Sequence, residues 1–150
     1  MRHGKCDGRV EIDGRHVAYD AAFLPHWRAF ADALEQYKYA LRAMPEDNET
    51  GFQLHGGVHL PSSVLDLLSN ALESTHFKIL LMQRNNFGRG GITFALDYMQ
   101  NNPQLEKFSL YSNPINHEDD INQLCDIIKV HPAIKEIVLE ECCGEGIDGH

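Results

Sequence analysis

The sequence predicts an α/β protein built from repeated strand–helix units. Three observations predict this class: an apolar pattern recurs at intervals of 28 and 29 residues, a helical pattern with one apolar face follows each copy, and prolines end two of these helices at equivalent places. One such unit is too short to bury its apolar side alone. We therefore expect the copies to stack and to share one interior, as in a solenoid.

The strand part of the pattern is apolar-x-x-apolar-x-apolar-x-x-Asn/Cys. It occurs in FKILLMQRNNF from Phe77, LEKFSLYSNPI from Leu105 and IKEIVLEECCG from Ile134. Alternate residues of a strand face the same side, so the two central apolar positions of each copy are expected to point inward. An earlier and weaker copy, GFQLHGGVH, keeps Phe52 and Leu54 at these positions. The sequence therefore predicts about four parallel strands.

Each strand segment is followed by apolar residues at i, i+3, i+4 and i+7, which is the stripe of a helix with one buried face. The stripes are Val64, Leu67, Leu68 and Ala71, then Ile92, Ala95, Leu96 and Met99, then Ile121, Leu124, Cys125 and Ile128. The expected N-caps are Ser62 or Ser63 and the Asp119/Asp120 pair. Pro103 and Pro132 are expected to close two of the helices.

The N-terminal segment does not follow this template. Residues 9–19, RVEIDGRHVAY, alternate on both sides of Asp13-Gly14, which predicts a β-hairpin. The stretch LPHWRAFADALEQYKYALRAM then predicts an amphipathic helix with Pro25 in its first turn. We expect residues 1–48 to form a hairpin-helix cap over the strand at 52–54, although Trp27 could instead anchor a partner. The repeats would occupy residues 49–76, 77–104, 105–133 and, in part, 134–150.

The residue that ends each copy of the pattern also has an expected structural role. Asn85 and Asn113 offer a donor and an acceptor to the backbone where the chain turns out of the strand, and Cys142 occupies the same position. With these residues, positions 49–145 resemble the leucine-rich repeats of the ribonuclease-inhibitor type. The resemblance implies an α/β leucine-rich-repeat solenoid with a parallel β-sheet on the concave side and α-helices on the convex side. That family includes ribonuclease inhibitors, Ran GTPase-activating proteins, tropomodulins and immune sensors, so the resemblance does not specify an activity.

Composition narrows the class of partner. The net charge is −9, and residues 116–150 carry nine acidic residues against Lys129 and Lys135. This charge repels phosphate backbones and would attract a basic protein, so we expect no nucleic acid partner. The sequence shows neither a membrane span nor a signal peptide, which predicts a cytoplasmic protein with reduced cysteines and no membrane partner.

The sequence shows no catalytic, cofactor-binding or metal site, and we expect the protein not to be an enzyme. Nucleophile, phosphate-loop and zinc-protease motifs are absent. His55 and His59 are four residues apart, but a strand and turn do not place them on one face. Cys142 and Cys143 with His150 are equally unsuited to zinc, because neighbouring thiolates are awkward joint ligands. The glycine-rich stretch FGRGGITF is expected to be a tight strand-to-helix connector.

A surface remains as the candidate site. Residues between the inward strand positions are expected on the concave face, where a protein partner would bind. The predicted partner-binding residues are Gln53, His55, Leu81, Gln83, Arg84, Lys107, Ser109, Tyr111, Val138, Glu140 and Glu141. Leu81, Tyr111 and Val138 are expected to provide affinity, and the charged residues to provide orientation.

Two alternative functions remain open at this point. One is regulation of a small GTPase, resembling the Ran activators, although the sequence distinguishes no arginine as a finger. The other is self-assembly through the strand around residues 137–139, whose far edge has no successor repeat.

Overall fold

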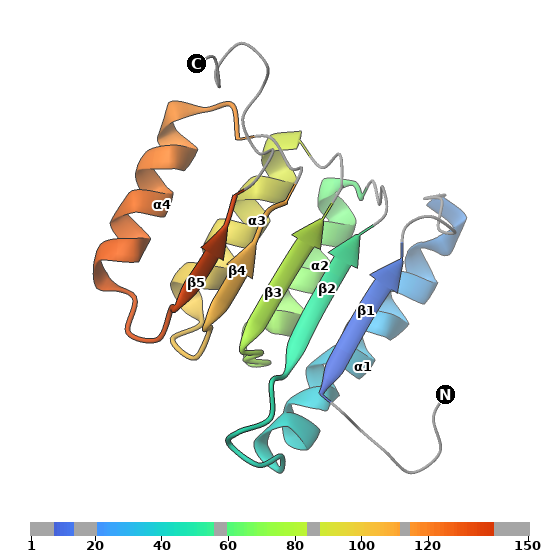
Figure 1. The fold of residues 1–150 in the computed structure, drawn as a ribbon. Helices are drawn as coiled ribbons and strands as arrows, with labels where there is room; N and C mark the ends of the chain where they lie inside the picture. Colours follow the sequence, from blue (N-terminus) through green and yellow to red (C-terminus); the bar gives the residue numbers. More distant parts are fainter. Residues whose placement is uncertain (1–7, 14–20, 56–59, 84–87, 112–114, 140–150) are drawn as a thin grey trace.

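A computed structural model describes residues 8–13, 21–55, 60–83, 88–111 and 115–139. These residues form strands and helices in strict alternation (Figure 1). The strands are β1 (Arg9–Asp13), β2 (Gly51–His55), β3 (Ile79–Gln83), β4 (Lys107–Ser109) and β5 (Glu136–Val138). The helices are α1 (Leu24–Arg42), α2 (Ser62–Leu72), α3 (Gly88–Asn101) and α4 (Glu118–Val130). The strands make one sheet in the order β1-β2-β3-β4-β5, and every neighbouring pair is parallel.

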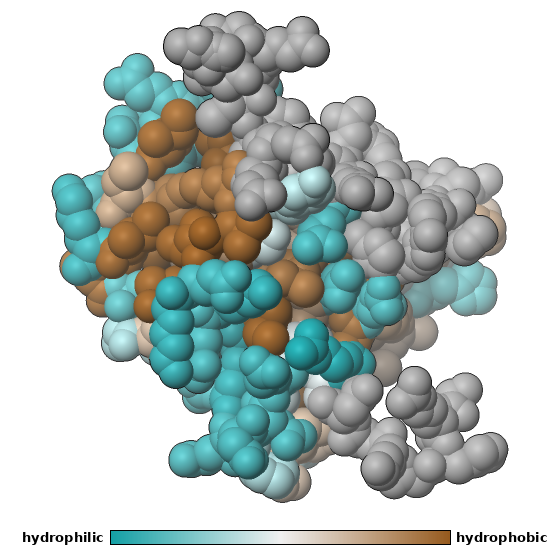
Figure 2. Space-filling view, in the orientation of Figure 1, coloured by the Kyte–Doolittle hydropathy of each residue, from teal (hydrophilic) through white to brown (hydrophobic). Residues whose placement is uncertain are grey.

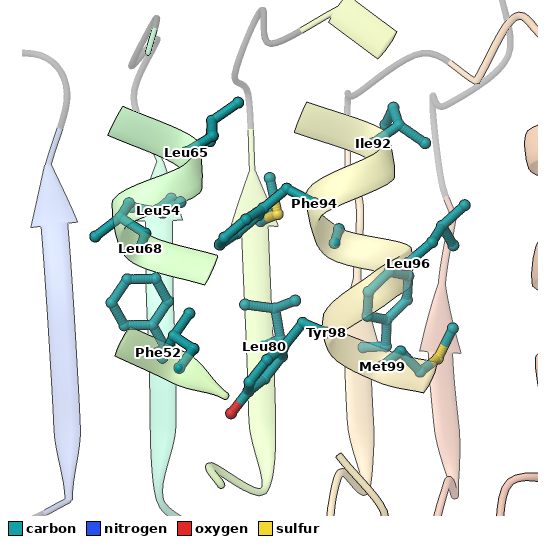
Figure 3. Packing of buried hydrophobic residues seen from close by; sticks show 14 of the residues in the cluster. Phe52, Leu54, Leu65, Leu68, Leu80, Ile92, Phe94, Leu96, Tyr98 and Met99 are labelled. Atoms are coloured by element: carbon teal, nitrogen blue, oxygen red, sulfur yellow. The ribbon is translucent and has the colours of Figure 1, made fainter. Parts of the chain in front are cut away.

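The helices lie on one side of the sheet, each beside the helix that precedes it (Figure 1). The core fills the space between the two layers, where side chains from β2 and β3 meet those from α2 and α3 (Figure 3). Phe52, Leu80 and Phe108 are fully buried at equivalent positions of successive strands. The α/β class and the parallel sheet predicted from the sequence are confirmed. The inward strand positions are confirmed in the first three copies of the pattern, whereas in the last copy Ile137 is half-buried and Leu139 is 37% exposed.

Backbone hydrogen bonds between units recur with the interval seen in the sequence. The amides of residues 78 and 79 both donate to the carbonyl oxygen of Thr50, those of residues 106 and 107 to that of Lys78, and those of residues 135 and 136 to that of Glu106. Successive acceptors are therefore 28 residues apart. Successive donor pairs are 28 and then 29 residues apart. The starts of β3, β4 and β5 are thus hydrogen-bonded to the backbone of the preceding unit.

Buried polar side chains also join neighbouring units. The Tyr98 hydroxyl donates to the carbonyl oxygen of Thr75 at 2.7 Å and accepts from the amide of Phe77 at 2.9 Å. The side-chain amide of Asn102 donates to the carbonyl oxygen of Phe77 at 2.7 Å. Burial raises the pKa of the Tyr98 phenol above its ordinary value, since the charged form would be desolvated there. These groups satisfy backbone atoms that would otherwise be unpaired in the interior.

The N-terminal segment adds a strand and a helix to the same two layers. The predicted helix is confirmed as α1, with Pro25 in its first turn. Trp27 is half-buried, packs against the core, and makes an edge-on contact with Phe30 at 6.0 Å between ring centroids. β1 covers the edge of β2, as expected of a cap, but it does so as a parallel strand. The second arm of the predicted hairpin, residues 15–19, lies outside the described residues.

The predicted N-caps are wrong. α2 starts at Ser62 after Pro61, α4 starts at Glu118 after His117, and neither start has a side-chain cap. Pro61 is extended and its carbonyl oxygen accepts from the amides of Val64 and Leu65, so the helix begins one residue earlier than a serine cap requires. α4 starts in the same way, because the carbonyl oxygen of His117 accepts from the amides of Asp120 and Ile121.

The other helix boundaries follow the sequence more closely. Pro103 and Pro132 each lie two residues beyond the ends of α3 and α4, as predicted. The glycine-rich stretch, predicted as a connector, instead supplies the first turn of α3 from Gly88. Asn85, Asn113 and Cys142, to which the sequence assigns turn roles, lie outside the described residues.

Candidate functional site

The candidate site is the side of the sheet opposite the helices, which we call the open face. Because strand residues alternate, the neighbours of the buried strand residues point to this side. Strand register arranges them in two rows that cross the whole sheet. One row is Arg9, Gly51, Ile79, Lys107 and Glu136, and the other is Glu11, Gln53, Leu81, Ser109 and Val138.

The second row contains the apolar part of the open face. Leu81 and Val138 are both half-buried and flank Ser109 on either side, so their strands are about 10 Å apart. Ser109 is only 1% exposed, and its hydroxyl oxygen accepts a hydrogen bond from the amide of Tyr111 at 3.4 Å. Tyr111 follows two residues later and is half-buried. Two half-buried apolar side chains therefore flank a buried serine on the C-terminal half of this surface.

A hollow of about 300 Å³ opens on the N-terminal half of the same face, over β1, β2 and β3. Its position follows from Gly51, which has no side chain. A Cβ atom added there would lie 3.3 Å from the Cβ of Ile79 and 3.4 Å from the Arg9 side chain, so a larger residue would fill the hollow. Arg9, Glu11 and Gln53 contribute polar groups to its walls, and Ile79 and Leu81 contribute aliphatic surface.

The described part of the open face is balanced in charge. Arg9 and Lys107 oppose Glu11 and Glu136, and Lys107 Nζ lies 3.6 Å from Glu136 Oε2. Exposed ion pairs of this kind contribute little to stability and are available to orient a partner. Of the nine acidic residues that predicted a basic partner, four lie on α4 and one, Glu136, lies on β5, while the other four lie beyond the described residues.

The structure places seven of the predicted partner-binding residues on β2–β5 or directly after them: Gln53, Leu81, Gln83, Lys107, Ser109, Tyr111 and Val138. His55 ends β2, but its side chain is outside the described part of the chain, as are Arg84, Glu140 and Glu141 altogether. Sequence reasoning missed Arg9 and Glu11, which join the open face through β1. The alternation of the apolar residues Val10 and Ile12 could have placed Arg9 and Glu11 on this face. The Asp13-Gly14 pair led instead to the prediction of a hairpin.

Another hollow lies away from the open face, as a groove of about 720 Å³ along α3 and α4. Gln123 on its wall already bonds to Asp97 and Gln100 across the two helices, at 3.2 Å in each case. Ile127 in the same groove is 5% exposed. The groove is therefore part of the seam between two packed helices.

Among the described residues, no group of three or more histidine, cysteine, aspartate or glutamate side chains could hold a metal ion. The strongly perturbed Tyr98 phenol lies in the interior between units, where its bonds are structural. In the same described ranges, no helix combines the length and the apolar character needed to cross a bilayer. A search of protein-family models, curated proteins and solved structures found no match to this chain.

Proposed function

We propose that the chain is a leucine-rich-repeat solenoid that recognises a protein partner on its open face. The repeat assignment is supported by the recurring backbone hydrogen bonds at Thr50, Lys78 and Glu106 together with the matching apolar strand positions. In such an architecture the sheet presents one residue per repeat in each row, so a partner meets a regular two-dimensional pattern of side chains.

One observation favours recognition of a protein partner over the other functions. Leu81 and Val138, with Tyr111 just beyond β4, keep apolar surface on the C-terminal half of a sheet face that no described helix covers. Aliphatic and aromatic side chains surrounded by polar ones are the usual composition of a recognition surface, with affinity in the centre and orientation at the rim. Gln53, Gln83 and the Lys107–Glu136 pair supply this rim.

The test compares partner capture by the native protein and by a Leu81→Ala, Tyr111→Ala double variant. A photo-crosslinking amino acid placed at Gln53 records what touches the open face, and the same amino acid at Val130, 80% exposed on α4, provides the control position. We expect proteins captured at position 53 but not at 130, with a loss of about tenfold or more in the double variant.

A matched Val130→Ala variant should capture the same proteins as the native chain. The proposal fails if the double variant, with an unchanged circular dichroism spectrum, retains every protein crosslinked at position 53.

A further inference from the structure

The C-terminal end of the sheet and helix layers keeps apolar residues on its surface. We define the end face as Ile121, Cys125 and Ile128 of α4 with Ile137 of β5 and Leu139 directly after it. Ile121 and Ile128 are each 43% exposed and Leu139 is 37% exposed. Figure 2 shows this hydrophobic surface gathered over α4 and β5.

The same positions are buried in the preceding units. Ile92, Leu96 and Met99 of α3 correspond to Ile121, Cys125 and Ile128, and they are at most 2% exposed. Likewise Met82 and Leu110 are fully buried where Leu139 is partly exposed. The inner positions are covered because another helix and strand follow, whereas in the described part of the chain β5 pairs only with β4. The end face therefore retains the chemistry of a contact between units.

Two exposed charges beside the end face have opposite sign, and the positive one, Lys129, lies 3.8 Å from Asp126 in the same helix. On α4, Glu118 and Lys129 border the apolar stripe at opposite ends of the helix. When two α4 helices pack antiparallel about Cys125, Ile121 of each copy lies near Ile128 of the other, and Glu118 near Lys129. A single two-fold axis brings the apolar pairs and the charged pairs into contact at the same time. It also places the two helix dipoles antiparallel, which is favourable.

A head-to-tail arrangement fits less well. The other end of the layers is covered by α1, whose exposed residues include Arg28, Asp32 and Glu35. These charged side chains do not match an aliphatic surface, because burying them unpaired is costly. The apolar end face is complemented by itself rather than by the opposite end of another copy.

We propose that this protein forms a two-fold dimer through the end face, with α4 packed against its counterpart and β5 paired antiparallel across the axis. The sheet then continues through both copies, and the edge of β5 gains a partner strand. The dimer uses a surface separate from the open face, so each copy keeps its recognition surface and the pair binds bivalently.

The test is sedimentation velocity over a wide range of protein concentration. We expect a monomer–dimer equilibrium whose dissociation constant rises by about tenfold or more in Ile121→Glu, because each dimer would bury two such carboxylates. Val130→Glu is the matched control, since Val130 is 80% exposed on the opposite side of α4, and it should leave the equilibrium unchanged.

Charge reversal and crosslinking test the two-fold geometry. Glu118→Lys and Lys129→Glu should each weaken the dimer, and their combination should restore it. In a variant with serine at positions 6, 142 and 143, a short bis-maleimide should link Cys125 to Cys125 of the second copy. A monomer at all concentrations overturns the proposal, as does an open-ended series of oligomers or a dimer that Ile121→Glu leaves intact. If Cys125 resists alkylation in the monomer, another part of this chain covers the end face. That result also overturns the proposal.

Discussion

Replacing Tyr98 with phenylalanine tests whether polar bonds between units stabilise the fold. The substitution keeps the ring, which is 7% exposed and packed in the core, and removes only the hydroxyl. The amide of Phe77 then loses its acceptor and the carbonyl oxygen of Thr75 loses a donor, at sites where water does not reach. Leaving each of these two buried polar groups unpaired costs about 1–2 kcal/mol, so we expect the free energy of unfolding to fall by about 2–4 kcal/mol in total.

The assay is urea unfolding followed by circular dichroism. With a slope of about 2 kcal/mol per molar urea, the expected loss lowers the midpoint by about 1–2 M without changing the slope. Tyr39→Phe is the control, because Tyr39 is 58% exposed and its hydroxyl can bond to water. A Tyr98→Phe midpoint within about 0.2 M of the Tyr39→Phe midpoint, at that same slope, would refute the reasoning.

Two further predictions concern titration and charge. The raised pKa of Tyr98 means that the folded protein holds a proton that the unfolded chain releases above about pH 10, so its stabilisation is complete below that pH and declines above it by up to about 1.4 kcal/mol per pH unit; alkaline unfolding should therefore be less steep in Tyr98→Phe than in Tyr39→Phe. Arg89→Ala removes the partner 3.4 Å from Asp120, whose side chain is 6% exposed, and should cost about 1–2 kcal/mol in urea unfolding. Asp126→Ala breaks an exposed pair with Lys129 and should cost under about 0.5 kcal/mol; equal losses for the two variants would contradict the assigned difference in burial.

Much of the fold could be predicted because its main signals are local. Phe52, Leu80 and Phe108 recur at nearly constant spacing, and the stripes that begin at Val64 and Ile92 have helical period, so strand, helix and inward face follow from the chain alone. The predicted caps failed because the carbonyl oxygens of Pro61 and His117 already accept from the first amides of α2 and α4, so both helices begin before the expected caps.

The candidate site was predicted less completely. Leu81, Tyr111 and Val138 follow from alternation along single strands, but exposure depends on the neighbours across the sheet. Ser109 has the same alternation as Leu81 and yet is 1% exposed, because half-buried side chains flank it on both sides. Arg9 joins the open face because β1 pairs with β2 while Val10 and Ile12 pack against the core, and the partner of a strand is not readable from one short strand.

By itself, the sequence determined the alternation of strands and helices, their period and the core residues of the inner units, since each of these depends on spacing along the chain. The tertiary structure alone decided the parallel placement of β1, the burial of the Tyr98 hydroxyl between units, and the contrast between Ile92 at 2% and Ile121 at 43% exposure. Equivalent residues differ in this way because burial is set by what packs beside a unit, and that neighbour is a property of the assembled layers rather than of any local pattern.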